Sequence, residues 1–125
     1  MPSARDTIAV DFDGVLQSYR TAFSEPTIIS DPPVPGAIEW LEELTKNYYV
    51  AINSTRCSDK QFWLAATAWF RRYGLSERAL SRITFPVNKP TARLYIDDRG
   101  FHFSGSFPSM EFVKNFLPWT KKFPK

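Results

Sequence analysis

Four short runs of apolar and β-branched residues are spaced along the chain, and the stretches between and after them repeat apolar residues every three or four positions. Runs of the first kind predict buried strands, and the second pattern predicts amphipathic helices. The clearest helix begins at Ser58, which forms a capping box with Gln61. Its apolar residues continue to Tyr73, and Gly74 then suits the left-handed conformation that ends many helices. Strands are expected at 7–12, 48–52, 82–85 and 93–96, and helices at 34–47, 58–73, 76–80 and 109–117.

Strands that alternate with helices indicate an α/β fold, here a three-layer, Rossmann-like and mainly parallel sheet with helices on both faces. A chain of 125 residues has the length of one domain. We therefore expect a single domain over 1–125, with a core from about 7 to 117 and a basic tail at 118–125. The irregular stretch after the first strand is expected to form a short hairpin or flap beside the strand ends, in which 15–16 pair with 27–29.

The composition is that of a soluble globular protein, with 43% hydrophobic and 23% charged residues. A formal net charge of +3 is too small to indicate a nucleic-acid binder, although it does not exclude one. Cys57 is the only cysteine, which excludes an internal disulfide and is typical of a reducing compartment. No apolar run approaches the roughly 20 residues that span a bilayer, and the first six residues show no signal segment. A cytoplasmic protein with no membrane partner is expected.

Polar residues follow the ends of the predicted strands. A charged side chain beside a buried strand is costly unless it is paired or has a function. The carboxyl ends of parallel strands meet at one edge of a sheet, where ligands bind in such folds, so we expect these side chains to share a site. They are Asp11 and Asp13 after the first strand, Ser54 after the second, Lys89 after the third, and Asp97 and Asp98 after the fourth.

This set of residues predicts a site for magnesium and phosphate. Four carboxylates at one edge would repel one another unless a cation lay among them, and all-oxygen ligands combined with substrate phosphate suit Mg²⁺. Ser54 and Lys89 add the hydroxyl donor and the positive charge that a phosphate group needs. A carboxylate can also attack a phosphoryl group as a nucleophile, and a second carboxylate can protonate the leaving oxygen and then activate water.

In this order the residues resemble the haloacid dehalogenase-like superfamily of phosphohydrolases. The resemblance covers about residues 7–98 and extends more loosely to Leu117. Four motifs carry it, each placed after or before its predicted strand: Asp-Phe-Asp-Gly-Val at 11–15, Ser54 in Ile-Asn-Ser-Thr-Arg, Lys89 before the fourth strand, and Ile-Asp-Asp at 96–98.

The resemblance implies a phosphatase that hydrolyses a phosphomonoester. Asp11 would be the nucleophile that becomes an aspartyl-phosphate, and Asp13 would be the general acid and base. Both would also bind Mg²⁺, Asp13 through its backbone carbonyl.

The later motifs would bind the phosphate and the metal. Ser54 and Lys89 would hold the phosphate, with Thr55 as the alternative if the register differs by one residue. In the final pair we expect Asp98 to bind the metal directly and Asp97 to lie behind it, although the sequence leaves the two open.

Members of this superfamily differ in a cap that covers the site, and this chain has no stretch long enough to form one. Open sites in the family are similar to those that act on large substrates such as proteins or nucleic-acid ends. The string Asp97-Asp98-Arg99 also resembles the phosphatase half of phage polynucleotide kinases. Small members can instead be closed by a neighbouring subunit, so a homo-oligomer is an alternative.

Two other functions fit part of the pattern. A receiver-like phospho-acceptor module has similar residues at its strand ends, but its acceptor aspartate would follow the third strand, where this chain has Phe85 and Pro86. A non-catalytic phosphate-binding protein would keep the fold without turnover. Arg56 is expected to pair with a carboxylate of the rim, with a role in substrate binding as the alternative. His102 is expected to be structural, with contact to the substrate as the alternative. The tail lysines are expected to be solvated, with contact to a polyanionic substrate as the alternative: Lys121, Lys122 and Lys125.

Overall fold

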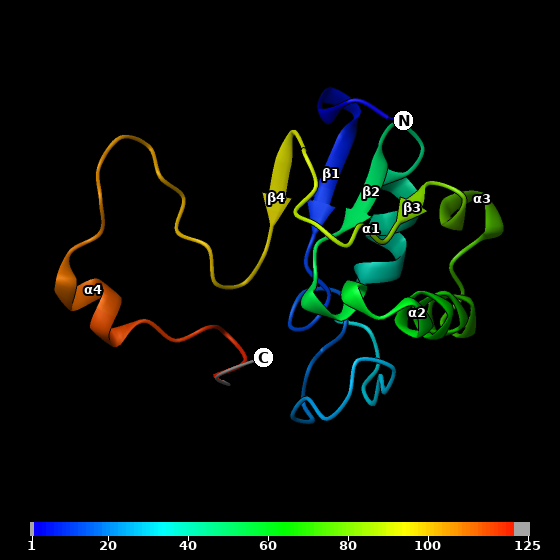
Figure 1. Cartoon of the computed structure of the whole chain (residues 1–125), viewed down its shortest axis with the longest axis horizontal. Helices are drawn as coiled ribbons and strands as arrows, with labels where there is room; N and C mark the ends of the chain where they lie inside the picture. Colours follow the sequence, from blue (N-terminus) through cyan, green and yellow to red (C-terminus); the bar gives the residue numbers. More distant parts are fainter. Residues whose placement is uncertain (1, 122–125) are drawn as a thin grey trace.

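The computed structural model describes residues 2–121, and its centre is a four-stranded sheet in which all strands are parallel (Figure 1). The strand order is β3-β2-β1-β4, so the first strand of the chain lies inside the sheet. The α/β, Rossmann-like fold class expected from the sequence is confirmed. The strands are β1 (Thr7–Val10), β2 (Tyr49–Ile52), β3 (Ile83–Thr84) and β4 (Leu94–Ile96).

The strand register brings three strand ends level with one another. Val10 of β1 lies opposite Ile52 of β2 and Ile96 of β4. The residues that follow these strands therefore leave the sheet at the same edge. Two further backbone hydrogen bonds extend the alignment by one residue, since the Asp11 N–H donates to the Ile96 carbonyl and the Asn53 N–H donates to the Val10 carbonyl, at 2.9 and 2.8 Å.

Large apolar side chains cover one face of the sheet. Ile8 and Val10 lie beside Val50 and Ile52 on this face, and all four are buried. Their partners come from α1 (Ala37–Leu44), α2 (Lys60–Arg72) and α3 (Glu77–Leu80), which share one core cluster with them. Phe12 packs edge-to-face against Phe62 and Trp69 of α2, with ring centroids 5.2 Å apart in both cases. This packing fixes the chain immediately after β1 against the longest helix.

The opposite face carries small side chains at its centre, beside Tyr49 of β2 and Tyr95 of the edge strand β4. In residues 2–121 an irregular segment crosses this face (Figure 1), so the expectation of helices on both faces of the sheet is not met there. Ala9 and Ala51 are paired there and almost fully buried. The crossover from β3 to β4, residues 85–93, has no helix and runs across β2 and β1 in Figure 1. Pro90 of this crossover lines a cavity together with Thr7 and Ala51. Small side chains on this face leave room for an irregular segment to pass close to the sheet.

Two local predictions were wrong. Helix α2 is capped by Asp59, whose side chain accepts a hydrogen bond from the Gln61 N–H, and Ser58 instead belongs to the 3₁₀ turn η2 (Thr55–Ser58). The expected pairing of 15–16 with 27–29 is absent among the described residues. Residues 16–18 pair with 32–34 instead, through hydrogen bonds from the Val34 N–H to Leu16 and from the Ser18 N–H to Pro32. The prolines at 32 and 33 still offer carbonyl acceptors, which is all that this pairing needs from Pro32.

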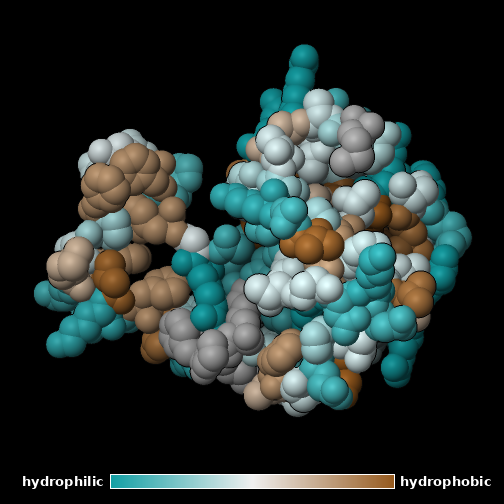
Figure 2. All heavy atoms as spheres, in the orientation of Figure 1, coloured by the Kyte–Doolittle hydropathy of each residue, from teal (hydrophilic) through white to brown (hydrophobic). Residues whose placement is uncertain are grey.

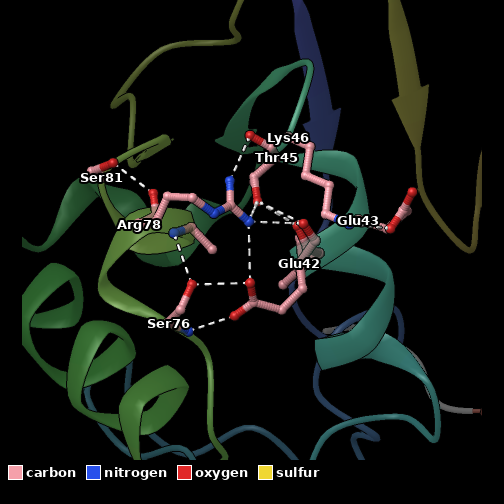
Figure 3. A network of polar contacts seen from close by, with 9 residues as sticks. Glu42, Glu43, Thr45, Lys46, Ser76, Arg78 and Ser81 are labelled. Atoms are coloured by element: carbon pink, nitrogen blue, oxygen red, sulfur yellow. Dashed lines mark hydrogen bonds and ion pairs between the residues drawn. The ribbon is translucent and has the colours of Figure 1, made fainter.

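Helices α1 and α3 are joined by a polar network (Figure 3). The Glu42 carboxylate accepts hydrogen bonds from the backbone N–H and the hydroxyl of Ser76. Arg78 donates to the same carboxylate at 3.1 Å and to the carbonyl of Thr45 at 3.0 Å. Because the last carbonyls of a helix lack partners within the helix, the arginine also completes the end of α1.

Residues 101–117 form an arm that leaves the sheet after β4 and stands away from the body (Figure 1). The arm carries α4 (Met110–Asn115), where Ser109 caps the helix as expected, and α4 has no buried residue. Figure 2 shows apolar side chains on its surface, and Phe107 is 85% exposed. The chain then returns to the body at Pro118, which is fully buried. None of the helices between residues 2 and 121 is long and apolar enough to span a bilayer.

Candidate active site

A cavity of about 510 Å³ opens at the carboxyl edge of the sheet. It lies where β1, β2 and β4 end, as the strand register requires. Residues from all three strand ends line it: Asp11, Asp13, Asn53, Ser54, Thr55, Asp97, Arg99 and Gly100. The expectation that polar residues after different strands share one edge therefore holds for most of the set.

Asp11 is held at the base of this cavity. Its backbone N–H bonds to Ile96, and its side-chain Oδ1 accepts a hydrogen bond of 2.7 Å from the Phe12 N–H. The residue is 9% exposed, and Phe12 beside it is fully buried. The buried neighbour fixes the backbone, so the carboxylate has a defined position at the cavity surface.

Gly14 allows the chain to turn away directly after the two aspartates. Its φ of +81° lies in the left-handed region, and a Cβ there would sit 2.5 Å from Oδ2 of Asp98. Only glycine avoids both the backbone strain and this clash. The Gly14 carbonyl accepts a hydrogen bond of 2.6 Å from the indole N–H of Trp119. The turn is thus packed against Asp98 on one side and held by the returning chain.

Asp13 is buried, and three N–H groups donate hydrogen bonds to its carboxylate. Arg56 donates to it twice, from Nε to Oδ2 at 2.9 Å and from Nη2 to Oδ1 at 3.0 Å. The side-chain amide of Gln17 donates to Oδ1 at 2.7 Å. The expected pairing of Arg56 with a carboxylate of the rim is confirmed, and the partner is the proposed acid and base.

Ser54 and Thr55 lie at the entry to η2, and both line the cavity. The Ser54 hydroxyl accepts a hydrogen bond of 3.2 Å from the Arg56 N–H, so its own proton can be donated to a ligand. Thr55 is exposed. Either hydroxyl can therefore meet a ligand oxygen, and the alternative between the two residues stays open.

The two acidic residues after β4 are placed differently from each other. Asp97 lines the cavity, and its Oδ1 accepts hydrogen bonds from the backbone N–H groups of Arg99 and Gly100. The carboxylate of Asp98 lies beside Gly14 and is not among the groups that line the cavity. The prediction named Asp98 as the direct metal ligand, whereas Asp97 is the residue that faces the cavity.

Lys89 is the one predicted phosphate ligand that lies elsewhere. Its ammonium group stacks over the ring of Tyr95, 4.8 Å from the centroid, and it is not among the residues that line the cavity. The lysine belongs to the irregular crossover between β3 and β4. Its position shortly before β4 in the sequence therefore did not show where along the sheet its side chain would lie. Arg99 is the cationic residue that lines the cavity instead.

The side chains that line the cavity offer oxygen atoms, which are the ligands that magnesium prefers. Within residues 2–121, no group of three or more histidine, cysteine, aspartate or glutamate side chains is arranged to hold a metal ion. Magnesium commonly takes only one or two carboxylates and completes its shell with water and substrate phosphate. Asp11 and Asp97, both on the cavity, provide that number of carboxylates.

Two other reactive side chains do not line the cavity. Cys57 is fully buried, and burial raises the pKa of its thiol to about 11, so it is not a nucleophile at neutral pH. His102 lines a neighbouring groove along β4 with Tyr95 and Phe101, and this groove shares Asp97 and Gly100 with the cavity. Lys121 is exposed, and the predictions for Lys122 and Lys125 concern residues outside the described range.

Asn53, Arg99 and Gly100 are the cavity residues to which the sequence assigned no role. Asn53 is the first residue after β2 and occupies the position that Asp11 occupies after β1, so the strand-end rule could have identified it. Arg99 directly follows the acidic pair after β4. Its place in the Asp-Asp-Arg string was visible, but the turn that brings it to the cavity was not.

Comparison of the chain with protein-family models, with curated proteins and with solved structures gave no match. The function is therefore inferred from the residues of the cavity.

Proposed function

We propose that the protein is a magnesium-dependent phosphatase that hydrolyses a phosphomonoester through an aspartyl-phosphate on Asp11. One observation carries the proposal. Two aspartates from β1, two hydroxyl residues from the end of β2, and an aspartate and an arginine from the end of β4 line the same cavity. Carboxylates, hydroxyl donors and a cation together serve the transfer of a phosphoryl group, where positioning and charge stabilisation dominate.

Asp11 performs the covalent step. One of its carboxylate oxygens attacks phosphorus and forms the new P–O bond, while the bond from phosphorus to the alcohol oxygen breaks. Asp13 donates a proton to the departing oxygen, so the alcohol leaves neutral. Asp13 then accepts a proton from water as the water attacks the aspartyl-phosphate, which releases inorganic phosphate and restores both carboxyl groups.

Ser54, Thr55 and Arg99 bind the phosphate in this proposal. The hydroxyl groups donate hydrogen bonds to the non-transferring oxygens, and the guanidinium group balances their negative charge. Arg99 takes the role that the sequence suggested for Lys89.

Asp11 and Asp97 would hold the magnesium ion, with the backbone carbonyl of Asp13 as a further oxygen ligand. When bound, the ion would offset the charge of the phosphate oxygens as the carboxylate approaches them. Asp98 supports the Gly14 turn beside these ligands in this assignment.

The test compares Asp11→Asn with Asp6→Asn, a matched change at an exposed aspartate remote from the cavity. Wild-type protein should release phosphate from an aryl phosphate in the presence of Mg²⁺, and this release should stop when EDTA is added. Asp11→Asn should lose activity by about 10³-fold or more, as removal of a nucleophile does in other enzymes, while Asp6→Asn keeps it. Retained activity in Asp11→Asn, or no release by the wild type from a panel of phosphate esters, would contradict the proposal.

A non-catalytic phosphate-binding protein is the second candidate, and the engagement of Asp13 by Arg56 and Gln17 favours it. Such a protein would gain thermal stability from phosphate or vanadate with Mg²⁺ but would not turn over any ester. The same panel of esters decides between the two.

A further inference from the structure

Arg56 joins Asp13 to a loop that is distant in sequence. Its planar guanidinium group uses one edge for Asp13, where Nε and Nη2 each meet one carboxylate oxygen. This two-point contact fixes the orientation of the carboxylate as well as its position, because a fork of two parallel bonds resists rotation. Both side chains are at least 95% buried, so water does not compete for the bonds.

The remaining nitrogen of the same group holds the loop. Nη1 of Arg56 donates to three backbone carbonyls, those of Glu25, Pro26 and Ile28, each at 3.0 Å. The ring of Phe23 lies over the guanidinium group, 4.8 Å from its carbon. A single side chain thus fastens the middle of the loop, whose own residues are mostly exposed.

The ends of the loop reach Asp13 by a second route. Gln17 donates to Asp13 and accepts a hydrogen bond of 3.2 Å from the Asp31 N–H. The Asp31 carboxylate in turn accepts hydrogen bonds from the backbone and hydroxyl of Thr21. Tyr19, which is fully buried and lies between Gln17 and Thr21 in the sequence, has a φ of +55°, a conformation that costs a non-glycine residue energy and persists only where its surroundings enforce it. Hydrogen bonds therefore connect both the middle and the ends of the loop to Asp13.

These contacts restrict what Asp13 can do. Two N–H donors bond to its Oδ1 and one bonds to its Oδ2, so they occupy three of the roughly four lone-pair positions of the carboxylate. The open position is on Oδ2, and the bond from Nε of Arg56 to this oxygen sets the direction in which that position points. The donor with the most contacts to the loop is Arg56.

We propose that Arg56 is a positioning residue for Asp13, and that through Arg56 the loop of residues 20–31 sets the orientation from which Asp13 transfers protons. This inference rests on the proposed function, in which Asp13 is the general acid. It assigns Arg56 no contact with the substrate.

The leaving group of the substrate provides a test. A general acid matters most for an alkyl phosphate, whose alcohol is a poor leaving group, and little for an aryl phosphate with an acidic phenol. Arg56→Lys keeps the positive charge and removes the two-point contact. It should lower kcat for the alkyl ester at least about tenfold more than kcat for the aryl ester, in the same sense as Asp13→Asn. Equal loss on both esters would mean a merely structural role and would overturn the proposal.

Arg72→Lys is the matched control, because Arg72 is exposed and stacks on Tyr73 of its own helix end. It should leave the ratio of alkyl to aryl turnover unchanged. Amide hydrogen exchange gives a second measurement that needs no activity. Exchange in residues 21–30 should become faster in Arg56→Lys and not in Arg72→Lys, and unchanged exchange in Arg56→Lys would also overturn the proposal.

The two proposals fail in different ways. If the wild type hydrolyses neither ester, the phosphatase function fails and proton transfer by Asp13 fails with it, while the exchange experiment still shows whether Arg56 holds the loop. If the wild type is active and Arg56→Lys lowers kcat for both esters equally, only the role of Arg56 is wrong.

Discussion

Two of the arginine–carboxylate contacts in the described residues have similar lengths and very different surroundings. Arg56 and Asp13 meet at 2.9 Å in the candidate site, with side chains 3% and 5% exposed. Arg78 and Glu42 meet at 3.1 Å between α3 and α1, with side chains 47% and 32% exposed. Bond length alone would rank the two contacts as equals. Exposure separates them, because water can replace a partner at the second contact and cannot do so at the first.

The comparison shows what each contact contributes. A buried pair gains little from its own attraction once desolvation is counted, but removal of one partner leaves a buried charge without compensation. A half-exposed pair holds two helices together at modest cost, and its loss is modest too. The first contact therefore fixes one arrangement of the site, and the second adds stability at the surface.

Removal of Arg56 should have the largest effect. Arg56→Met keeps the length of the side chain and leaves Asp13 buried without its cation, which should lower the free energy of unfolding by about 3–5 kcal/mol. Urea denaturation at pH 7 measures this change. The double variant Arg56→Met with Asp13→Asn should recover part of the loss, because the buried charge is gone. A loss no greater than that of Arg72→Met would show that burial does not decide the value of this contact.

Glu42→Gln should have a smaller, pH-dependent effect. The backbone N–H of Ser76, then its hydroxyl and Arg78, lower the pKa of Glu42 against an opposing effect of burial. A lowered pKa in the folded state stabilises the protein above the ordinary pKa of glutamate, and this gain is lost as the pH falls through the lowered value. At pH 7 the free energy of unfolding of the wild type should exceed that of Glu42→Gln by about 1 kcal/mol. Urea denaturation at a series of pH values should show this difference vanish in acid.

The control for this prediction is Glu43→Gln on the same helix, because Glu43 pairs only with the exposed Lys46. At pH 7 the free energy of unfolding of Glu43→Gln should lie within about 0.5 kcal/mol of the wild-type value, because solvent screens this exposed pair. A Glu42 difference that grows as the pH falls would contradict the assigned direction of the shift.

Glu77→Gln should have the smallest effect, although its contact is the shortest of the three. Glu77 meets Arg71 through two hydrogen bonds of 2.8 Å, which lower the pKa of its carboxyl group. Both side chains are more than half exposed, so solvent screens the contact. The melting temperature should stay within experimental error of the wild type. A drop comparable to that of Glu42→Gln would mean that geometry outweighs exposure in this protein.

The strands, most helices and most of the cavity could be predicted because they depend on local patterns. Asp11 and Ser54 lie where they were expected, since each follows a strand whose end the apolar run defines. The choice between Asp97 and Asp98 could not be made, because it depends on a turn in which Asp97 bonds to the next backbone N–H groups. Lys89 was misplaced because the crossover that carries it has no helix to fix its direction.

The arm shows the limit of periodicity as a guide. The apolar spacing after Ser109 predicted a helix, and α4 begins there. The same pattern also implied a surface for that helix to pack on. In the described part of the chain Phe112 meets the ring of Phe101, yet Phe112 and Val113 remain about half exposed. Periodicity identifies the apolar face of a helix but does not identify its partner.

The hydrogen bond from Trp119 to Gly14 has a consequence for the order in which the protein is made. The two residues are 105 positions apart, and Gly14 leaves the ribosome long before Trp119 is added. The sheet can assemble once β4 has emerged, but the turn after Asp13 gains this partner only when the returning segment follows. This hydrogen bond is therefore a long-range contact that can form only after all four strands have been synthesised.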